Sequence, residues 1–228
     1  MLAMDADKAK ELAAQRSLEF IEDGMVVGMG SGTTATHFIK LLGERVKQGL
    51  KVRGIASSKA SEDLAVSLSI PVTDFHECPE IDVAIDGADE LTHQLELIKG
   101  GGGALLREKI VASASKRFII VADSRKLVNK LGKFPLPVEV IQMASPLVAA
   151  KLQKLGLRTT VRKAASGAEY ITDEGNLILD CEGGEIEDPY KLADSIRQIV
   201  GVVEHGLFLE MANVALIAGD SEITELIR

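Results

Sequence analysis

"DGADELTHQLELIKGGGGALLREK", residues Asp86–Lys109, places the acids Asp86, Asp89 and Glu90 before a lysine, Lys99, four consecutive glycines and a further acid, Glu108, in one short passage. The passage is too polar for a core element. It is also bracketed by the apolar runs "IDVAI" and "FIIVA", which would not flank a flexible linker so regularly. Buried strands joined by polar, glycine-rich connections are typical of parallel α/β sheets, in which ligands bind at the carboxyl ends of the strands. The stretch therefore indicates both a fold class and a functional site.

Helix and strand signals alternate throughout the first part of the chain. Strands are predicted at 25–30, 51–57, 81–86 and 117–123, and helices at 5–23, 33–49, 58–69 and 104–115. Asp7 is expected to cap the first helix, and "LELIK" at 95–99 is a further short strand that delivers Lys99. Short apolar strands separated by helices predict a parallel sheet covered on both faces.

The pattern changes after "NKLGKFPLP", where a glycine and two prolines cluster. The segments that follow, from "VEVI" to "VVEHGLFLE", give the order strand, helix, strand, strand, helix, strand, which is the split βαβ order of ferredoxin-like units. "NVALIAG" at 213–219 is expected to return to the first sheet. The predicted α/β fold thus has a Rossmann-like catalytic domain (1–130 plus about 211–228) and a smaller ferredoxin-like α+β domain (about 131–210). The second domain is expected to supply subunit contacts, because an exposed sheet face needs cover.

Bulk composition excludes several classes of protein. The chain has 228 residues, 46% of them hydrophobic, which is enough for a substantial core, and its net charge of -8 argues against nucleic acid as a partner. Cys78 and Cys181 lie far apart without paired spacing, so neither a disulfide framework nor a zinc site is expected. No apolar run approaches the roughly 18 residues of a membrane span, and no signal-peptide core is present. A cytoplasmic protein is expected.

A glycine-rich loop, "GMGSGTT" at Gly28–Thr34, lies between the first predicted strand and the second helix. An anion fits at such a helix N-terminus, so the loop is either a phosphate cradle or an ordinary tight turn with a threonine cap. The dinucleotide pattern G-x-G-x-x-G is absent because Thr33 stands at its third glycine, and no acid ends the second strand to hold a ribose. NAD is therefore disfavoured.

The acids of the first-quoted stretch are expected at the same sheet edge as this loop. Asp86 and Asp89 follow a strand, the glycines allow backbone to approach a ligand closely, and Glu108 lies one turn inside the next helix. The alternative is a solvated acidic turn with Glu108 on the helix surface. Acids, Lys99 and a phosphate cradle suggest proton transfer on a phosphorylated sugar, with lysine and N–H groups holding the enediolate oxygen.

Magnesium on Asp86 and Asp89 is the rival chemistry, and it is disfavoured because the adjacent lysine would repel the ion. The four histidines, at positions 37, 76, 93 and 205, share no metal spacing and are assigned structural or surface roles.

Four motifs in this order, "GSGTTATHFI", "DGADE", "KGGGGALLREK" and "ADSRK", resemble ribose-5-phosphate isomerase of type A. The resemblance spans nearly the whole chain, including "GVVEHGLF" and "NVALIAG". It implies interconversion of ribose 5-phosphate and ribulose 5-phosphate in the non-oxidative pentose phosphate pathway, with no metal and no organic cofactor. It also implies a homo-oligomer, either a homodimer or a homotetramer.

The resemblance also implies roles for individual residues. Glu108 is the general base between C2 and C1, Asp86 assists ring opening and binds hydroxyls, Asp89 binds hydroxyls, and Lys99 stabilises the oxyanion. The phosphate is assigned to Ser31, Gly32, Thr33, Thr34 and Lys126, with Lys10 a weaker candidate, and the other implied substrate-binding residues are Gly87, Ala88, Gly100, Gly101 and Gly102. Lys109 is expected to point away from the site.

Two positions depart from the family pattern. The loop often reads Gly-Thr-Gly-Ser-Thr, whereas here Ser31, Thr33 and Thr34 keep the hydroxyls in a different order. Arg125 replaces a common serine before Lys126, which affects only the expected local packing. Two other classes stay open: a non-catalytic sugar-phosphate sensor, which would need no Glu108, and a transferase or deaminase on a related scaffold.

Overall fold

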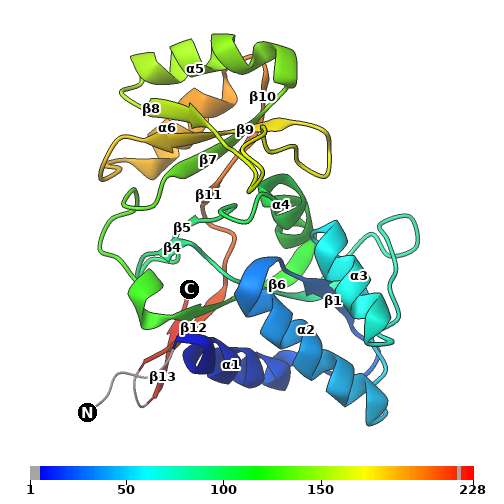
Figure 1. Cartoon of the computed structure of the whole chain (residues 1–228). Coiled ribbons are helices and arrows are strands. Elements are labelled where there is room, and N and C mark those ends of the chain that lie inside the picture. Colours follow the sequence, from blue (N-terminus) through cyan, green and yellow to red (C-terminus); the bar gives the residue numbers. More distant parts are fainter. Residues whose placement is uncertain (1–5, 220–221) are drawn as a thin grey trace.

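The computed structural model describes residues 6–219 and 222–228, and its largest sheet has six strands in the order β13-β12-β6-β3-β1-β2 (Figure 1). The strands are β1 (Val26–Met29), β2 (Arg53–Ala56), β3 (Ile81–Asp86), β6 (Ser115–Asp123), β12 (Val214–Ala218) and β13 (Ile223–Ile227). All neighbours pair in parallel except β13, which is antiparallel to β12. The predicted parallel sheet and the return of 213–219 to it are confirmed, whereas β13 was not predicted.

Both faces of this sheet are buried, as its apolar strands predicted. Val27 and Met29 point into a core shared with the helices on one face, and Val26 points into a separate core on the other face. The first face is covered by α1 (Ala6–Ser17), α2 (Gly32–Lys47) and α3 (Lys59–Ser67), and the second by α4 (Leu105–Ser113). Asp7 lies inside the first turn of α1, so its predicted role as N-cap is wrong.

A second sheet has four antiparallel strands in the order β10-β7-β9-β8, the ferredoxin-like arrangement. Its elements are β7 (Leu136–Val140), α5 (Ser145–Lys154), β8 (Arg158–Val161), β9 (Leu177–Glu182), α6 (Pro189–Arg197) and β10 (Val202–His205). The domain boundaries near 131 and 211 stay a prediction.

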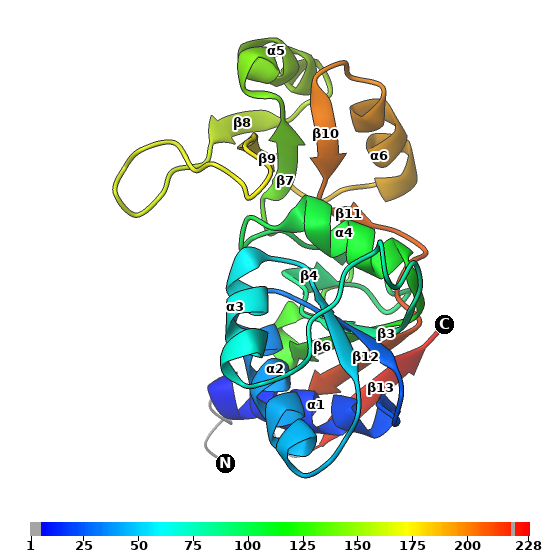
Figure 2. The same cartoon turned by 90° about the vertical axis from the view of Figure 1, so that its right-hand side faces the viewer.

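The central strands of the ferredoxin-like sheet are covered on both faces within the chain. α5 and α6 pack on one face, and α4 lies against the other, between the two large sheets (Figure 2). On this second face Glu139 is 1% exposed and accepts hydrogen bonds from Thr172 Oγ1 and Asn176 Nδ2, both at 2.9 Å. The central strands therefore need no cover from another subunit, and the role of this domain in subunit contacts stays a prediction.

A small third sheet lies between the two larger ones and was only partly predicted (Figure 1). It consists of β4 (Glu90–Leu91), β5 (Leu97–Ile98) and β11 (Leu207–Phe208), and short 3₁₀ turns occupy Leu18–Phe20, Ser124–Lys126 and Gln142–Ala144. The predicted strand "VVEHGLFLE" splits at Gly206, whose N–H donates to Pro137 O (2.8 Å) and whose carbonyl accepts from Lys99 N (2.9 Å). A Cβ on Gly206 would overlap the Lys99 carbonyl, so glycine is required where the sheets meet.

Among the helices formed by residues 6–219 and 222–228, none is long and apolar enough to cross a membrane.

Candidate active site

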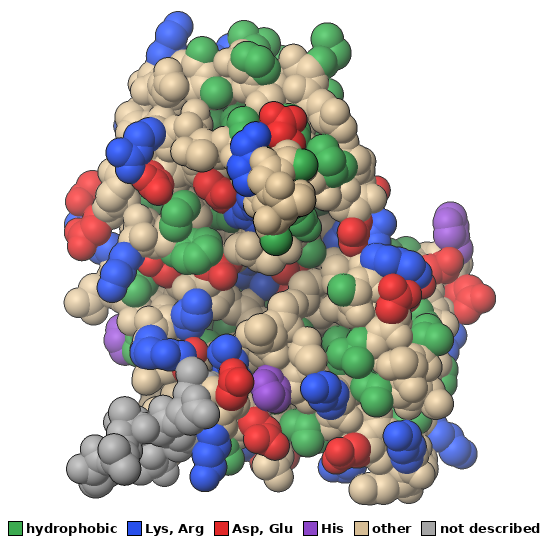
Figure 3. Space-filling view, in the orientation of Figure 1, with side chains coloured by type: hydrophobic (Ala, Val, Ile, Leu, Met, Phe, Trp, Pro, Cys, Tyr) green, Lys and Arg blue, Asp and Glu red, His purple; other side chains and the backbone are tan. Residues whose placement is uncertain are grey.

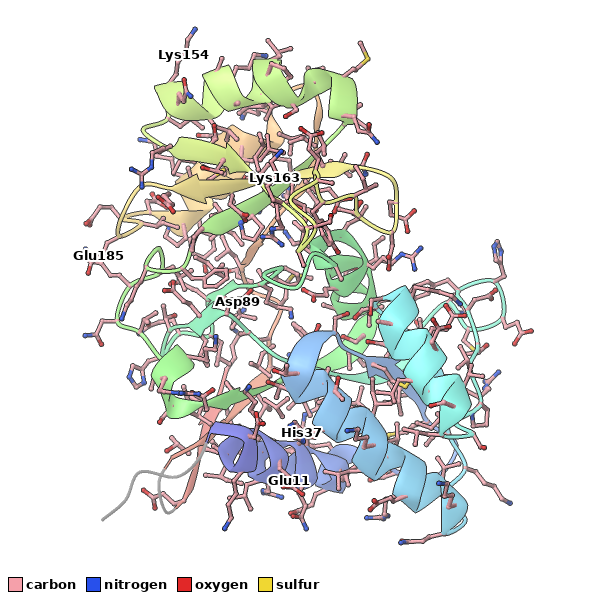
Figure 4. All side chains as sticks on the ribbon, viewed as in Figure 1. Glu11, His37, Asp89, Lys154, Lys163 and Glu185 are labelled. Carbon is pink, nitrogen blue, oxygen red and sulfur yellow. The ribbon has the colours of Figure 1, made fainter. Side chains whose placement is uncertain are left out.

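A polar cleft of about 130 Å³ lies at the carboxyl ends of β1 and β3, beside β5. It is lined by Lys10, Ser31, Gly32, Thr33, Thr34, Gly87, Ala88, Asp89, Lys99, Gly100, Gly101, Gly102, Glu108 and Lys126. These are all the residues expected at the site except Asp86, which contacts the lining residue Lys99. Figure 4 labels Asp89 in the middle of the molecule, between His37 on α2 and Lys163 on the ferredoxin-like unit.

The loop between β1 and α2 presents an uncapped helix N-terminus to the cleft. Ser31 is the N-cap residue but makes no capping bond; its Oγ lies 2.8 Å from Ser57 Oγ instead. Gly32 has φ +81°, a conformation that favours glycine. Lys10 Nζ donates to Thr33 Oγ1 at 3.1 Å and brings a positive charge to the same place. The threonine-cap alternative is wrong, and the loop combines a helix N-terminus that no N-cap side chain satisfies, hydroxyls and a lysine in an arrangement suited to an anion.

Lys126 reaches the cleft from the 3₁₀ turn that follows β6. The turn is held by Asp123, whose Oδ1 accepts from Arg125 N at 3.1 Å and from Arg125 Nε at 2.7 Å. The arginine that departs from the family pattern thus folds back onto Asp123. Lys126 Nζ lies 6.0 Å from the centre of the Phe134 ring and lines the cleft.

Three buried ionisable groups meet at the inner end of the cleft. Lys99 Nζ lies 2.9 Å from Asp86 Oδ2 and 3.3 Å from Glu108 Oε2, and it donates to Gly87 O at 2.6 Å. Asp86, Lys99 and Glu108 are 3%, 2% and 4% exposed, so a solvated acidic turn and a surface Glu108 are both wrong. Burial alone would lower the pKa of Lys99, but the charges of Asp86 and Glu108 outweigh it and raise that pKa.

The two carboxylates of this cluster differ in how their oxygens are used. Asp86 Oδ1 accepts from Ser31 N (3.1 Å) and Gly87 N (2.7 Å), and Oδ2 faces Lys99. Glu108 Oε2 is buried and accepts no hydrogen bond from the described residues, although Lys99 is close. Asp86 therefore ties the anion loop to Lys99, whereas Glu108 keeps an oxygen available to take a proton.

The pKa of the Glu108 carboxyl is raised to a value close to neutral pH. Burial raises its pKa to about 7, the negative charges of Asp86 and Asp89 raise it as well, and Lys99 acts in the opposite direction. A general base works best when its pKa is near the working pH, because it must be ionised and must also release the proton it takes. Glu108 meets both requirements.

The glycines between Lys99 and α4 form a backbone wall of the cleft. Gly100 and Gly103 have φ +97° and +90°, and Gly101 N donates to Asp89 Oδ2 at 2.7 Å. A Cβ on Gly101 would lie 2.6 Å from Asp89 Oδ1, so the side chain of Asp89 can approach only a glycine. The sequence indicated this close approach of backbone but not its partner.

The outer side of the glycine wall is held by two residues that the sequence did not indicate. Arg162 Nη1 donates to Gly100 O at 2.8 Å and to Gly101 O at 3.0 Å, and Tyr170 Oη lies 3.5 Å from Gly102 O. Both lie more than 50 residues away along the chain, after β8, so no local motif could have identified them.

Lys109 lies outside the lining of the cleft, as expected, but it does not point to solvent. It is 8% exposed, and its Nζ donates to Glu204 Oε1 (2.8 Å), His205 O (2.6 Å) and Leu207 O (2.9 Å). Burial lowers its pKa to about 8. Lys109 thus anchors α4, and with it Glu108, to the segment that joins β10 and β11.

Lys109→Met is expected to lower the free energy of unfolding by about 3 kcal/mol, because it leaves two carbonyls without this donor and removes the closest charged partner of the Glu204 carboxylate. Urea denaturation measures this change. Lys116→Met is the matched control, since Lys116 is likewise a lysine paired with acids, here Glu80 and Asp82, but its side chain is 60% exposed. The control is expected to change stability by less than about 1 kcal/mol. Equal, small losses in both variants would contradict the anchoring role.

Comparison with known proteins identifies a family for this chain. The profile described as "Ribose 5-phosphate isomerase A (phosphoriboisomerase A)" matches residues 53–222. The chain is 51% identical over 209 residues to the ribose-5-phosphate isomerase A of Sphingopyxis alaskensis, covering 92% of this chain and 91% of that protein.

Solved structures agree with the sequence comparison. A D-ribose-5-phosphate isomerase in complex with phospho-erythronic acid is 38% identical, with a TM-score of 0.96 over 99% of this chain and 100% of that one. The ribose 5-phosphate isomerase A of Neisseria gonorrhoeae is 40% identical, with a TM-score of 0.92 over 99% of this chain and 98% of that one. Agreement in sequence and fold over nearly the full length shows that this chain belongs to the ribose 5-phosphate isomerase A family.

Proposed function

We propose that the chain interconverts D-ribose 5-phosphate and D-ribulose 5-phosphate through an enediolate. The observation that carries the proposal is the buried Glu108 Oε2, which lies 3.3 Å from Lys99 Nζ and accepts no hydrogen bond from the described residues, in a cleft that also contains an uncapped helix N-terminus and two further lysines. The relatives carry the name of this activity, and one of them binds phospho-erythronic acid.

In the proposed reaction the phosphate binds to Ser31–Thr34, Lys10 and Lys126, which leaves the carbon chain facing Glu108. Glu108 takes the proton from C2 of the open-chain aldose, and the electron pair of that bond forms the C1–C2 double bond of an enediolate whose charge rests on O1. Lys99 stabilises this oxyanion. A proton passes from O2 to O1, and Glu108 returns its proton to C1, which yields the ketose.

We assign the sugar hydroxyls to Asp89, whose carboxylate is oriented by Gly101 N, and ring opening to Asp86. Magnesium chemistry is disfavoured because the Lys99 ammonium already lies 2.9 Å from Asp86 Oδ2 and would repel the ion. A non-catalytic sensor domain transfers no proton, so it would not need a buried glutamate whose pKa is raised to about 7. The family match disfavours a transferase or deaminase.

The activity is tested by mixing the protein with ribose 5-phosphate in EDTA and following ketose formation. Turnover is expected to persist, and isomerisation in heavy water is expected to place deuterium at the carbon beside the ketose carbonyl. Return of the original proton from the shielded Glu108 reduces the label without removing it. Loss of activity in EDTA that Mg²⁺ restores would exclude the proposed mechanism, and so would complete absence of label.

Lys126→Ala is expected to raise KM for ribose 5-phosphate strongly and to lower kcat to a smaller extent, because binding energy at the phosphate also positions the reacting carbons. Steady-state kinetics measures both. Lys130→Ala is the control, since Lys130 is an exposed lysine four residues away that pairs with Glu187 and lies outside the cleft. Unphosphorylated ribose is expected to be a very poor substrate. Equal turnover of ribose and ribose 5-phosphate would exclude the phosphate site.

We further propose that the chain forms a homo-oligomer through an apolar surface at the start of α5. Met143, Leu147 and Val200 are 90%, 53% and 77% exposed, and Ile141 N bonds to Gly201 O, which brings the two segments together. Figure 3 shows hydrophobic side chains gathered over this end of the molecule, at the top of the view. Exposed apolar surface of this kind marks contact sites.

Light scattering after gel filtration tests the surface and gives the subunit number. Met143→Glu with Leu147→Glu is expected to yield a smaller species, whereas Ile227→Glu, at an exposed apolar residue on β13, is expected to leave the mass unchanged. An unchanged mass in the double variant would exclude this surface.

A cytoplasmic location is also proposed. Cys78 and Cys181 are free and buried, which fits a reducing compartment.

A further inference from the structure

The glycines that form one wall of the cleft have no side chains, yet they connect Lys99 to the helix that carries Glu108. The separation of these two charged groups must be maintained for the proposed reaction. Lys99 directly precedes Gly100, and α4 with Glu108 begins two residues after Gly103. Glycines with positive φ have large conformational freedom, so the observed geometry needs support from outside the loop. Within the cleft, that support is the bond from Gly101 N to Asp89.

Arg162 supplies support from the opposite side. Its guanidinium, with a side chain 13% exposed, donates to the carbonyls of both Gly100 and Gly101 and is held by Asp180 on β9. Nε donates to Asp180 Oδ2 at 3.0 Å and Nη2 bonds to Asp180 Oδ1, the two-pronged arrangement that fixes the plane of an arginine. The Asp180 carboxylate also balances the positive charge of Arg162. Arg162 therefore acts on the loop by holding its backbone in position and not by adding charge.

The segment that follows Arg162 is tied to both parts of the molecule. Asp173 Oδ2 accepts from Lys59 N at the start of α3 (2.9 Å), and Glu174 Oε1 pairs with Arg107 on α4. Figure 4 shows Lys163, the next residue along the chain, above Asp89. These contacts hold the segment that follows Arg162 in place. The guanidinium of Arg162 therefore keeps a fixed position against the carbonyls of the glycine wall.

We propose that Arg162, oriented by Asp180, is a positioning residue that sets the separation of Lys99 and Glu108 by holding the carbonyls of Gly100 and Gly101. The proposal rests on the isomerase function proposed above. It predicts an effect on the reacting end of the substrate only, because the phosphate is bound by residues of α1, α2 and the turn after β6, none of which contacts Arg162.

Arg162→Ala is expected to lower kcat for ribose 5-phosphate about 10- to 100-fold with KM within about twofold, since misplacement by ~1 Å at a reacting centre has effects of this size. Added millimolar guanidinium is expected to restore part of the lost kcat. Asp180→Asn, which keeps the size of the side chain, is expected to lower kcat in the same direction by a smaller factor. Arg162→Lys is expected to resemble alanine, because an ammonium cannot bind Asp180 and two carbonyls in one plane.

Arg158→Ala is the matched control. Arg158 begins β8, which ends just before Arg162, and pairs with Glu182 on β9, the strand that also carries Asp180, but its side chain is 79% exposed and its ion pair lies outside the cleft. Its kcat and KM are expected to equal those of the parent.

The results of these experiments distinguish failure of the proposed isomerase function from failure of the proposed role of Arg162. Absence of isomerase activity in the parent would exclude the function itself. With an active parent, an Arg162→Ala protein that keeps its kcat, or that raises KM alone, would overturn the positioning role. A loss of kcat that guanidinium does not restore, together with full activity in Asp180→Asn, would overturn it as well. If Arg162→Ala does not fold, the kcat of Asp180→Asn decides.

Discussion

Glu108→Gln is expected to reduce kcat for ribose 5-phosphate about 10²–10⁴-fold, the usual effect of removing a general base. Glutamine keeps the size of the side chain but cannot take the proton from C2. KM and the affinity for phospho-erythronic acid are expected to change little, because the phosphate-binding residues are untouched and chemistry is then slower than substrate release. Steady-state kinetics and isothermal calorimetry measure the two effects separately.

Glu62→Gln is the matched control for this substitution. Glu62 is the fourth residue of the nine-residue helix α3, as Glu108 is of α4, and its side chain is 40% exposed outside the cleft. The control is expected to retain full activity. A Glu108→Gln protein that is folded, binds the ligand and still isomerises at the parent rate would remove Glu108 from the mechanism and leave Asp86 as the next candidate base.

The same residue determines the expected pH dependence. Because burial raises the pKa of Glu108 to about 7, kcat/KM is expected to fall as the pH is lowered through about 7, and this limb is expected to vanish in Glu108→Gln. The folded state binds this proton more tightly than the unfolded state, so the associated stability is complete below about pH 4.5 and is lost as the pH rises through about 7. Above pH 7 the glutamine variant is therefore expected to be at least as stable as the parent.

The sequence predicted those parts of the fold and of the cleft that depend on local patterns. Apolar runs separated by helices are sufficient to predict a parallel sheet, and the carboxyl ends of its strands bring Ser31 and Asp86 to one edge, where the short strand β5 delivers Lys99. Four glycines in a row indicated close approach of backbone. The residues that line the cleft therefore follow from short motifs, while their catalytic roles remain predictions.

Features that depend on contacts between distant segments could not be predicted in this way. Gly206 splits one apolar run between two sheets because the Lys99 backbone passes it too closely for a Cβ. In the sequence Lys109 resembles a surface residue of an amphipathic helix. In the structure its Nζ donates hydrogen bonds to backbone carbonyls of a segment almost 100 residues later. Arg162 lies in an ordinary polar strand sequence, and only the packing of the ferredoxin-like sheet over the cleft gives it a role.

Lys99→Met is expected to have a large effect on stability as well as on catalysis. The side chain of Lys99 is 3% exposed and forms ion pairs with two carboxylates that are each 4% exposed. Loss of one partner from a buried ionic cluster lowers the free energy of unfolding by about 3–5 kcal/mol. For a chain of this length that corresponds to a fall in Tm of roughly 10 °C. Loss of the oxyanion partner is expected to lower kcat about 10²–10³-fold.

The double variant Lys99→Met with Glu108→Gln distinguishes buried charge from simple loss of packing. Lys99 acts to lower the pKa of Glu108, so in Lys99→Met that pKa rises further and the protein loses most stability at high pH, where Glu108 is forced to ionise. Glutamine removes this charge, so the double variant is expected to be more stable than Lys99→Met above pH 7, and the two are expected to converge at low pH. Thermal unfolding measured across this pH range tests the coupling. If the two proteins unfold at the same temperature at every pH, Lys99 and Glu108 do not form an interacting pair.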